Sequence, residues 1–163
     1  MDSTELTSTF TVGDTVVYPS QGVGSIKGTE TRKERQYIRI RINTSNMDIL
    51  LPASEAGNLG LRHLASVEET NKALDSLSSR HTRCSSDWKT RLSENQNLLK
   101  TGNLHSIAQV VNTLYRRSKM KELPTLERKL YESALSMLVD ESSSVLGINS
   151  EDMRREIFAK LEA

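Results

Sequence analysis

The sequence predicts an α+β protein, in which a small β-barrel is followed by a compact helical bundle. Over roughly the first 65 residues, apolar and polar side chains alternate with the period of a strand, and glycines interrupt the pattern. From Ser66 onward, apolar residues recur every three or four positions, as they do on one face of a helix. This change of period divides the chain into two structural parts.

The N-terminal part, residues 1–65, reads as short strands. The first strands are expected between residues 10 and 18, and Gly22, Gly24 and Gly28 follow at the spacing of bulges and bends in small barrels. Residues 37–42 then alternate isoleucine with arginine, and residues 47–52 complete a hairpin after a polar turn. Several short, glycine-punctuated strands predict a small Tudor-like (SH3-like) barrel.

The segment 66–86 is predicted to hold one helix and a linker. Ser66 and Glu69 form a capping box that opens a helix to about Leu77. Residues 78–85 are polar and have no apolar periodicity, so we expect them to connect this helix to the next domain.

Residues 87–163 are predicted to form a compact helical domain. A helix from Asp87 to Lys100 is expected to end at Gly102, and Asn103 caps the next helix. The remaining expected features are a third helix over about 125–140, a loop over 142–149 and a final helix over 151–161 capped by Ser150. Short connections between amphipathic helices are typical of a bundle.

The formal net charge of +1 hides an uneven distribution along the chain. Residues 1–75 carry 8 Lys/Arg against 10 Asp/Glu, residues 76–135 carry 11 against 5, and residues 136–163 carry 3 against 6. The middle of the chain is therefore the natural place for a polyanion to bind, although a solvated helical surface also collects cations.

Several functional classes find little support. Cys84 is the sole cysteine, no run of about 18 apolar residues occurs, and the polar start is unlike a signal peptide, so we expect a cytoplasmic protein without membrane contact. The histidines are scattered without metal-ligand spacing. Residues 86–89 and 100–102 match two penicillin-binding elements, but the third is missing. We predict no catalytic residues, no metal, no cofactor and no enzyme.

Trp88 is the candidate contact residue of the helical domain. It lies in the first turn of a predicted helix beside Lys89 and Arg91, and a flat apolar side chain among cations can stack on a base or wedge into DNA. Trp88 also shares a helical face with Leu92 and Leu99, so it could belong to the core. Further cations, suited to phosphate contact or to the stabilisation of a helix C-terminus, are Arg116, Arg117, Lys119, Lys121, Arg128 and Lys129.

Collinear motifs resemble the bacterial CarD/CdnL family of transcription factors. They are Gly13-Asp14-Thr15-Val16-Val17-Tyr18-Pro19-Ser20-Gln21-Gly22-Val23-Gly24, Leu50-Leu51-Pro52, Trp88-Lys89-Thr90-Arg91, Lys100-Thr101-Gly102, Leu114-Tyr115-Arg116-Arg117 and the segment Leu123 to Leu130. The resemblance spans about residues 10–141 without a large gap, and the order of the motifs makes it specific.

The resemblance implies a Tudor-like domain that binds the β subunit of bacterial RNA polymerase and a helical domain that binds promoter DNA at the upstream edge of the transcription bubble. It implies that such a protein stabilises the open complex formed with the housekeeping sigma factor. DNA contact, largely independent of sequence, would fall to Trp88 as a minor-groove wedge with Lys89, Arg91 and Arg128. The polymerase-binding surface would include Arg32, Ile40, Leu50 and Pro52.

This chain departs from the family pattern at three places. The usual Trp-Asn-Arg-Arg is here Trp-Lys-Thr-Arg, so Thr90 replaces an arginine and Lys89 can compensate. The hairpin from Arg32 to Tyr37 is shorter than in some members. Leu50 stands where some members have an arginine, which implies a more apolar contact.

Two alternatives remain open at this stage. The first is a helical adaptor that binds only proteins and holds Trp88 in its core. The second is a sequence-specific repressor, although no exposed face with several Asn, Gln and Arg residues marks a recognition helix. We expect a monomer.

Overall fold

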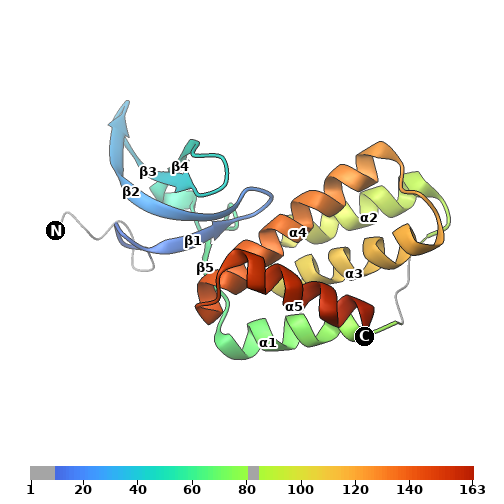
Figure 1. The fold of residues 1–163 in the computed structure, drawn as a ribbon. Coiled ribbons are helices and arrows are strands. Elements are labelled where there is room, and N and C mark those ends of the chain that lie inside the picture. Colours follow the sequence, from blue (N-terminus) through green and yellow to red (C-terminus); the bar gives the residue numbers. More distant parts are fainter. Residues whose placement is uncertain (1–9, 81–84) are drawn as a thin grey trace. The chain divides into compact units, whose positions relative to one another are not determined.

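The computed structural model describes residues 10–80 and 85–163, and it divides between Leu64 and Ala65 into an N-terminal and a C-terminal unit (Figure 1). Strands make up the first unit and helices the second, so the predicted α+β class is confirmed. The helix predicted within the segment 66–86 belongs to the C-terminal unit. Cys84 and His81 lie outside the described residues.

The N-terminal unit is a five-stranded antiparallel sheet with the order β4-β3-β2-β1-β5. Its strands are β1 (Thr15–Tyr18), β2 (Gly22–Arg32), β3 (Arg35–Ile42), β4 (Asp48–Pro52) and β5 (Arg62–His63). Residues 22–25 of β2 pair with β1, and residues 24–32 pair with β3 on its other side. One long strand therefore joins both halves of the sheet.

Alternation along β3 decides which face of the sheet is buried. Ile38, Ile40 and Ile42 are buried, whereas Arg39 and Arg41 are exposed on the opposite face. The register of β2 against β3 shifts between Ile26 and Gly28, which is where the glycine pattern predicted an irregularity. The apolar face buries one core cluster with Phe10, Val16, Ile26, Leu51 and Leu61 among its members.

The C-terminal unit contains five α-helices in its described part: α1 (Val67–Asp75), α2 (Trp88–Thr101), α3 (Leu104–Met120), α4 (Thr125–Leu146) and α5 (Ser150–Glu162). A 3₁₀ turn, η2 (Ser76–Ser78), follows α1. Helix α3 contacts α1, α2 and α4, and it is the most buried helix because its apolar residues occupy most of its circumference (Figure 1). It thereby forms the centre of the second core cluster.

The helix boundaries follow local caps where the sequence supplies them. Ser66, Asp87 and Asn103 each accept a hydrogen bond from the backbone N–H of the third residue of the helix that follows, and Gly102 ends α2 in a left-handed conformation. Two expectations were wrong. Helix α4 continues to Leu146 instead of ending near residue 140, and Asn149, not Ser150, caps α5.

Candidate functional site

The N-terminus of α2 is built around Asp87. Its carboxylate accepts hydrogen bonds from Thr90 Oγ1 at 2.8 Å and from the Thr90 backbone N at 3.3 Å. These two bonds stabilise the charged form and lower the pKa of Asp87 below its usual value. A capped start of this kind fixes the first helical residue, which is Trp88.

Trp88 is exposed at this helix start. The residue retains 39% of its accessible surface, and it does not belong to the buried core cluster of the helical unit. Lys89 places its ammonium group 5.8 Å from the centroid of the indole ring. Leu99, on the same helical face, is buried, and Leu92 is half-buried. The helix thus directs its leucines inward while the indole meets solvent next to a cation.

Arg91 is placed differently from an exposed phosphate contact. It is only 2% exposed, and its Nε and Nη2 atoms donate to the two carboxylate oxygens of Glu127 at 2.5 and 2.9 Å. Its Nη1 atom donates to the backbone oxygens of Ser85 and Ser86. The expectation that Arg91 contacts DNA directly does not fit this placement, because its donors are directed into the protein.

The ion pair brings α4 to the start of α2. Glu127 lies in the first turn of α4 and is fully buried, while its neighbours Leu126 and Arg128 are exposed, Leu126 by 54%. Of the four predicted DNA-contact residues, Trp88 and Lys89 therefore lie at the helix start that Glu127 reaches, and Arg128 follows Glu127 directly on α4.

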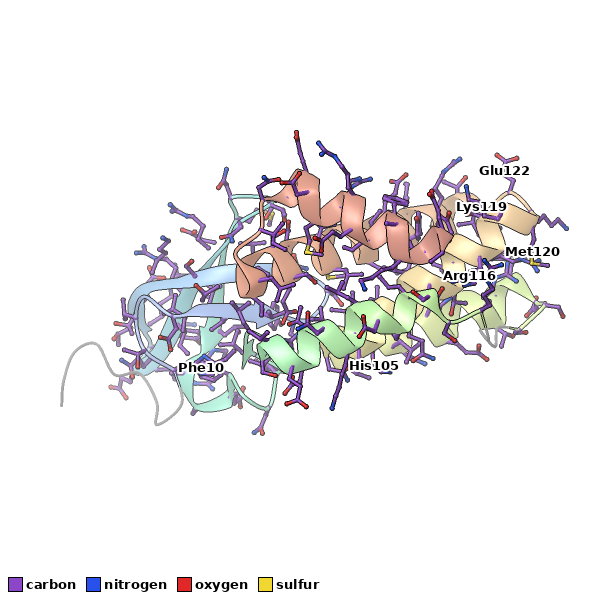
Figure 2. The ribbon with its side chains drawn as sticks, turned by 60° about the horizontal axis from the view of Figure 1, so that its bottom comes forward. Phe10, His105, Arg116, Lys119, Met120 and Glu122 are labelled. Carbon is purple, nitrogen blue, oxygen red and sulfur yellow. The ribbon has the colours of Figure 1, made fainter. Side chains whose placement is uncertain are left out.

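A second group of cations lies near the end of α3. Figure 2 shows Arg116, Lys119 and Met120 there, with Glu122 in the segment that follows. Arg116 donates to the backbone oxygens of Leu77 and Ser79 and to the Asn112 side chain, so it ties α3 to η2. Lys119 Nζ lies 5.1 Å from the centroid of the Tyr115 ring. Arg116 thus has a structural role, whereas Lys119 and Lys121 remain exposed.

The N-terminal unit offers an edge strand. In the described part of the chain β4 pairs only with β3, with Leu50 opposite Arg39 and Pro52 opposite Tyr37. Residues opposite each other in an antiparallel pair share a face, and Leu50 and Pro52 are half-buried there. An edge strand of this kind can accept a strand from a partner.

The other two predicted polymerase-contact residues, Arg32 and Ile40, differ in their exposure to solvent. Arg32 is exposed at the end of β2 and pairs with Glu30 at 3.3 Å, beside a turn in which Lys33 and Glu34 both have positive φ. Ile40 is fully buried on the inner face of β3, so its placement on a contact surface is wrong. The alternation of β3 directs Arg39, one residue earlier, to the outer face instead.

Sequence reasoning missed the role of Glu127. An acidic residue in the first turn of a helix is ordinarily attributed to the helix dipole, and no local pattern pairs it with an arginine 36 positions away. The apolar pattern of the helix over 125–140 predicts that Leu126 is buried, and this was wrong, because Leu126 is exposed. Met120, at the end of α3, is also exposed.

Other chemistries receive no support from the geometry. Across residues 10–80 and 85–163, no three His, Cys, Asp or Glu side chains are grouped closely enough to hold a metal ion. No helix of the described chain combines the length and the apolar character needed to cross a membrane. The Lys100-Thr101-Gly102 segment is the end of α2, not part of a strand as a penicillin-binding site requires.

Comparisons with known proteins cover both units. Residues 10–65 match the CarD-like/TRCF RID domain, and residues 72–158 match the CarD C-terminal domain. A protein of Bacillus subtilis (strain 168) named "Putative transcription factor YdeB" is 28% identical over 149 residues, which cover 89% of this chain and 97% of the relative. The two domains occur in the order that the motifs predicted, and the second match alone spans more than half of the 163 residues. The chain belongs to the CarD family of transcription regulators, which is not a known class of enzymes.

Proposed function

We propose that this protein binds the β subunit of bacterial RNA polymerase through its N-terminal unit and promoter DNA through its helical unit. It contacts the DNA at the upstream edge of the transcription bubble and stabilises the open complex formed with the housekeeping sigma factor. In this proposal it acts as a monomer in the cytoplasm, on polymerase bound to the nucleoid.

The observation that carries the DNA part of the proposal is the exposed indole of Trp88 beside Lys89. With Lys89 beside the ring, the indole can stack on a base while the ammonium group contacts a phosphate. Arg128 on the adjacent helix adds a phosphate contact. Phosphate contacts and a wedge carry little base information, so binding is largely independent of sequence.

The polymerase part of the proposal rests on β4 and on the family match of residues 10–65. Leu50 and Pro52 supply an apolar surface, and the edge of β4 supplies backbone donors and acceptors. Arg39 on the same outer face, and Arg32 at the hairpin end, add charge.

The mechanism follows from the preference of a wedge for unstacked DNA. Stacking of an aromatic side chain on an exposed base contributes about 1–3 kcal/mol, and this contact is absent when the duplex is closed. Such a difference shifts the equilibrium between closed and open complexes by about 5-fold to about 150-fold. Weak affinity for DNA suffices, because attachment to polymerase raises the local concentration of the helical unit.

The variant Trp88→Ala tests the wedge. We expect the lifetime of open complexes on a linear promoter fragment, challenged with a competitor, to fall about tenfold relative to the parent protein. The matched control is Val67→Ala. Val67 is likewise the exposed first residue of a capped helix in the same unit, at 55% exposure, and its loss should leave the lifetime unchanged. An unchanged lifetime for a folded Trp88→Ala protein excludes the wedge and favours an adaptor that binds only proteins.

A further inference from the structure

The ion pair between Arg91 and Glu127 joins two helices at the point where Trp88 is presented. Both side chains are buried, and the guanidinium makes bonds in two directions. One edge meets the Glu127 carboxylate on α4, and Nη1 meets the backbone oxygens of Ser85 and Ser86 at 3.0 and 3.3 Å. Arg91 therefore holds a helix and an irregular segment of the chain at the same time.

A buried ion pair is a weak source of stability. The cost of removing both charges from water offsets most of their attraction, so apolar residues of similar volume often serve equally well. What an apolar pair lacks is direction. The planar guanidinium donates hydrogen bonds only in fixed directions, and it can donate to a carboxylate and to two carbonyl groups at the same time. The pair thus specifies geometry more than it adds stability.

The geometry specified here is the approach of the chain to α2. Ser85 and Ser86 directly precede the cap residue Asp87, and Trp88 follows it. The indole is too exposed for burial alone to fix its orientation. Bonds to the two preceding carbonyl groups and to α4 restrict the backbone from which the indole projects.

We propose that Arg91 and Glu127 are positioning residues that fix the orientation in which Trp88 is offered to DNA. The proposal rests on the wedge function stated above and deepens it. Its consequence is that a residue which never meets DNA determines part of the affinity for DNA. A wedge whose orientation is not fixed in the free protein loses conformational entropy when it binds, and this loss weakens binding.

The decisive experiment is the full-length double variant Arg91→Met/Glu127→Leu. Apolar replacements of similar size keep the interior filled and leave no unpaired buried charge, so the protein should stay folded. The bonds to Ser85 and Ser86 are lost. Two readouts follow: the residual fluorescence anisotropy of Trp88, which is the sole tryptophan of the chain, and the affinity for a labelled duplex that contains an unpaired bubble.

We expect the residual anisotropy of Trp88 to fall on the nanosecond timescale and the affinity for bubble DNA to fall by about tenfold. Circular dichroism and urea unfolding establish that the variant is folded. The control is the double variant Asp75→Leu/Lys160→Met, which removes another ion pair between two elements of the helical unit, with 3.0 Å between the charged atoms. It should alter neither readout.

Parent-like anisotropy and affinity in a folded Arg91→Met/Glu127→Leu protein overturn the proposal, because the pair would then only fill space. Should that variant fail to fold, Arg91→Lys decides the question. A single ammonium retains the charge opposite Glu127 but cannot also bond both carbonyl groups, so anisotropy and affinity should again fall. Parent-like values for folded Arg91→Lys overturn the proposal as well.

The wedge function and the positioning role can fail separately. If Trp88→Ala binds bubble DNA as well as the parent does, the wedge function is wrong whatever the ion pair does. The anisotropy of the free protein still reports whether Arg91 and Glu127 order the indole. An unchanged anisotropy with a strong effect of Trp88→Ala retains the wedge and removes the positioning role.

Discussion

Asp87 links the state of the α2 helix start to pH. Its carboxylate is charged at neutral pH and accepts two hydrogen bonds from Thr90, which lower its pKa in the folded protein. In the unfolded chain the same group has its ordinary pKa, near 3.9. Protons therefore bind the unfolded chain more readily, and the contribution of Asp87 to stability is fully present above about pH 4.

Loss of that contribution should be visible at low pH. As the pH falls from about 4 through the lower folded pKa of Asp87, we expect the first turn of α2 to loosen and the emission of Trp88 to shift to longer wavelength. The variant Asp87→Ser keeps a capping oxygen that does not titrate in this range. Its Trp88 emission should depend less on pH, and an identical pH profile for both proteins would show that the cap does not control the helix start.

Residues differ in how far the sequence alone could place them. Asp87 and Trp88 were predictable because a cap and its helix are determined within a few positions of the chain. Ile40 was misplaced although the alternation of β3 already assigned isoleucines to the inner face; the family resemblance outweighed that local signal. The pairing of Arg91 with Glu127 was not predictable, because only the packing of α2 against α4 brings them together.

At the level of elements, β2 depends on one close backbone approach. A Cβ atom on Gly24 would lie 2.6 Å from the Arg41 backbone oxygen of β3 and 3.0 Å from a methyl group of Ile40. The Arg41 oxygen is a backbone atom, so it cannot move away without disturbing the ladder between β2 and β3. Only glycine fits at this position without displacement of the neighbouring strand.

The variant Gly24→Ala should destabilise the N-terminal unit by about 1–3 kcal/mol, the usual cost of overpacking. Urea unfolding followed by circular dichroism measures this change. Gly57→Ala is the control, since a Cβ there meets no atom within 4 Å, and its midpoint should stay near that of the parent. Equal midpoints for both variants would mean that β2 and β3 separate at little cost.

Some helix ends could be predicted from neighbouring residues in the sequence, and others could not. Capped ends at Ser66, Asp87 and Gly102 were predicted because the capping residue and its partner are neighbours in the sequence. The end of α4 was not, because a run of serines after residue 141 resembles a loop. Ser142 is nevertheless buried, and helical packing carries α4 on to a left-handed Gly147. Tertiary contacts here override a weak local preference.

At the scale of the whole molecule, two chemically different surfaces lie on two different units. The outer face of β3 and β4 offers apolar residues, and β4 lies at the edge of the sheet in the described chain. The exposed indole belongs to α2, and exposed cations lie on α2, α3 and α4. The proposed function needs both surfaces, because one attaches the protein and the other acts on DNA.

The two surfaces should be separable by single substitutions. Leu50→Glu introduces a charge on the edge strand and is expected to abolish capture of the polymerase β subunit while the affinity for bubble DNA stays unchanged. Trp88→Ala should do the reverse. Either variant should shorten the lifetime of open complexes, because tethering and wedging act in series. Asn58→Glu, in an exposed turn of the N-terminal unit, serves as the control. A loss of DNA affinity in Leu50→Glu would instead indicate one shared surface.

If the protein binds polymerase as proposed, the brevity of β4 limits how long it stays bound. Only five residues form this edge, and Pro52 at its end has no N–H to donate. A partner strand can therefore form few backbone hydrogen bonds, and the area it covers is small. Contacts of this size dissociate quickly. We therefore expect one molecule to be replaced by another between successive rounds of initiation, so that its effect follows its cellular concentration.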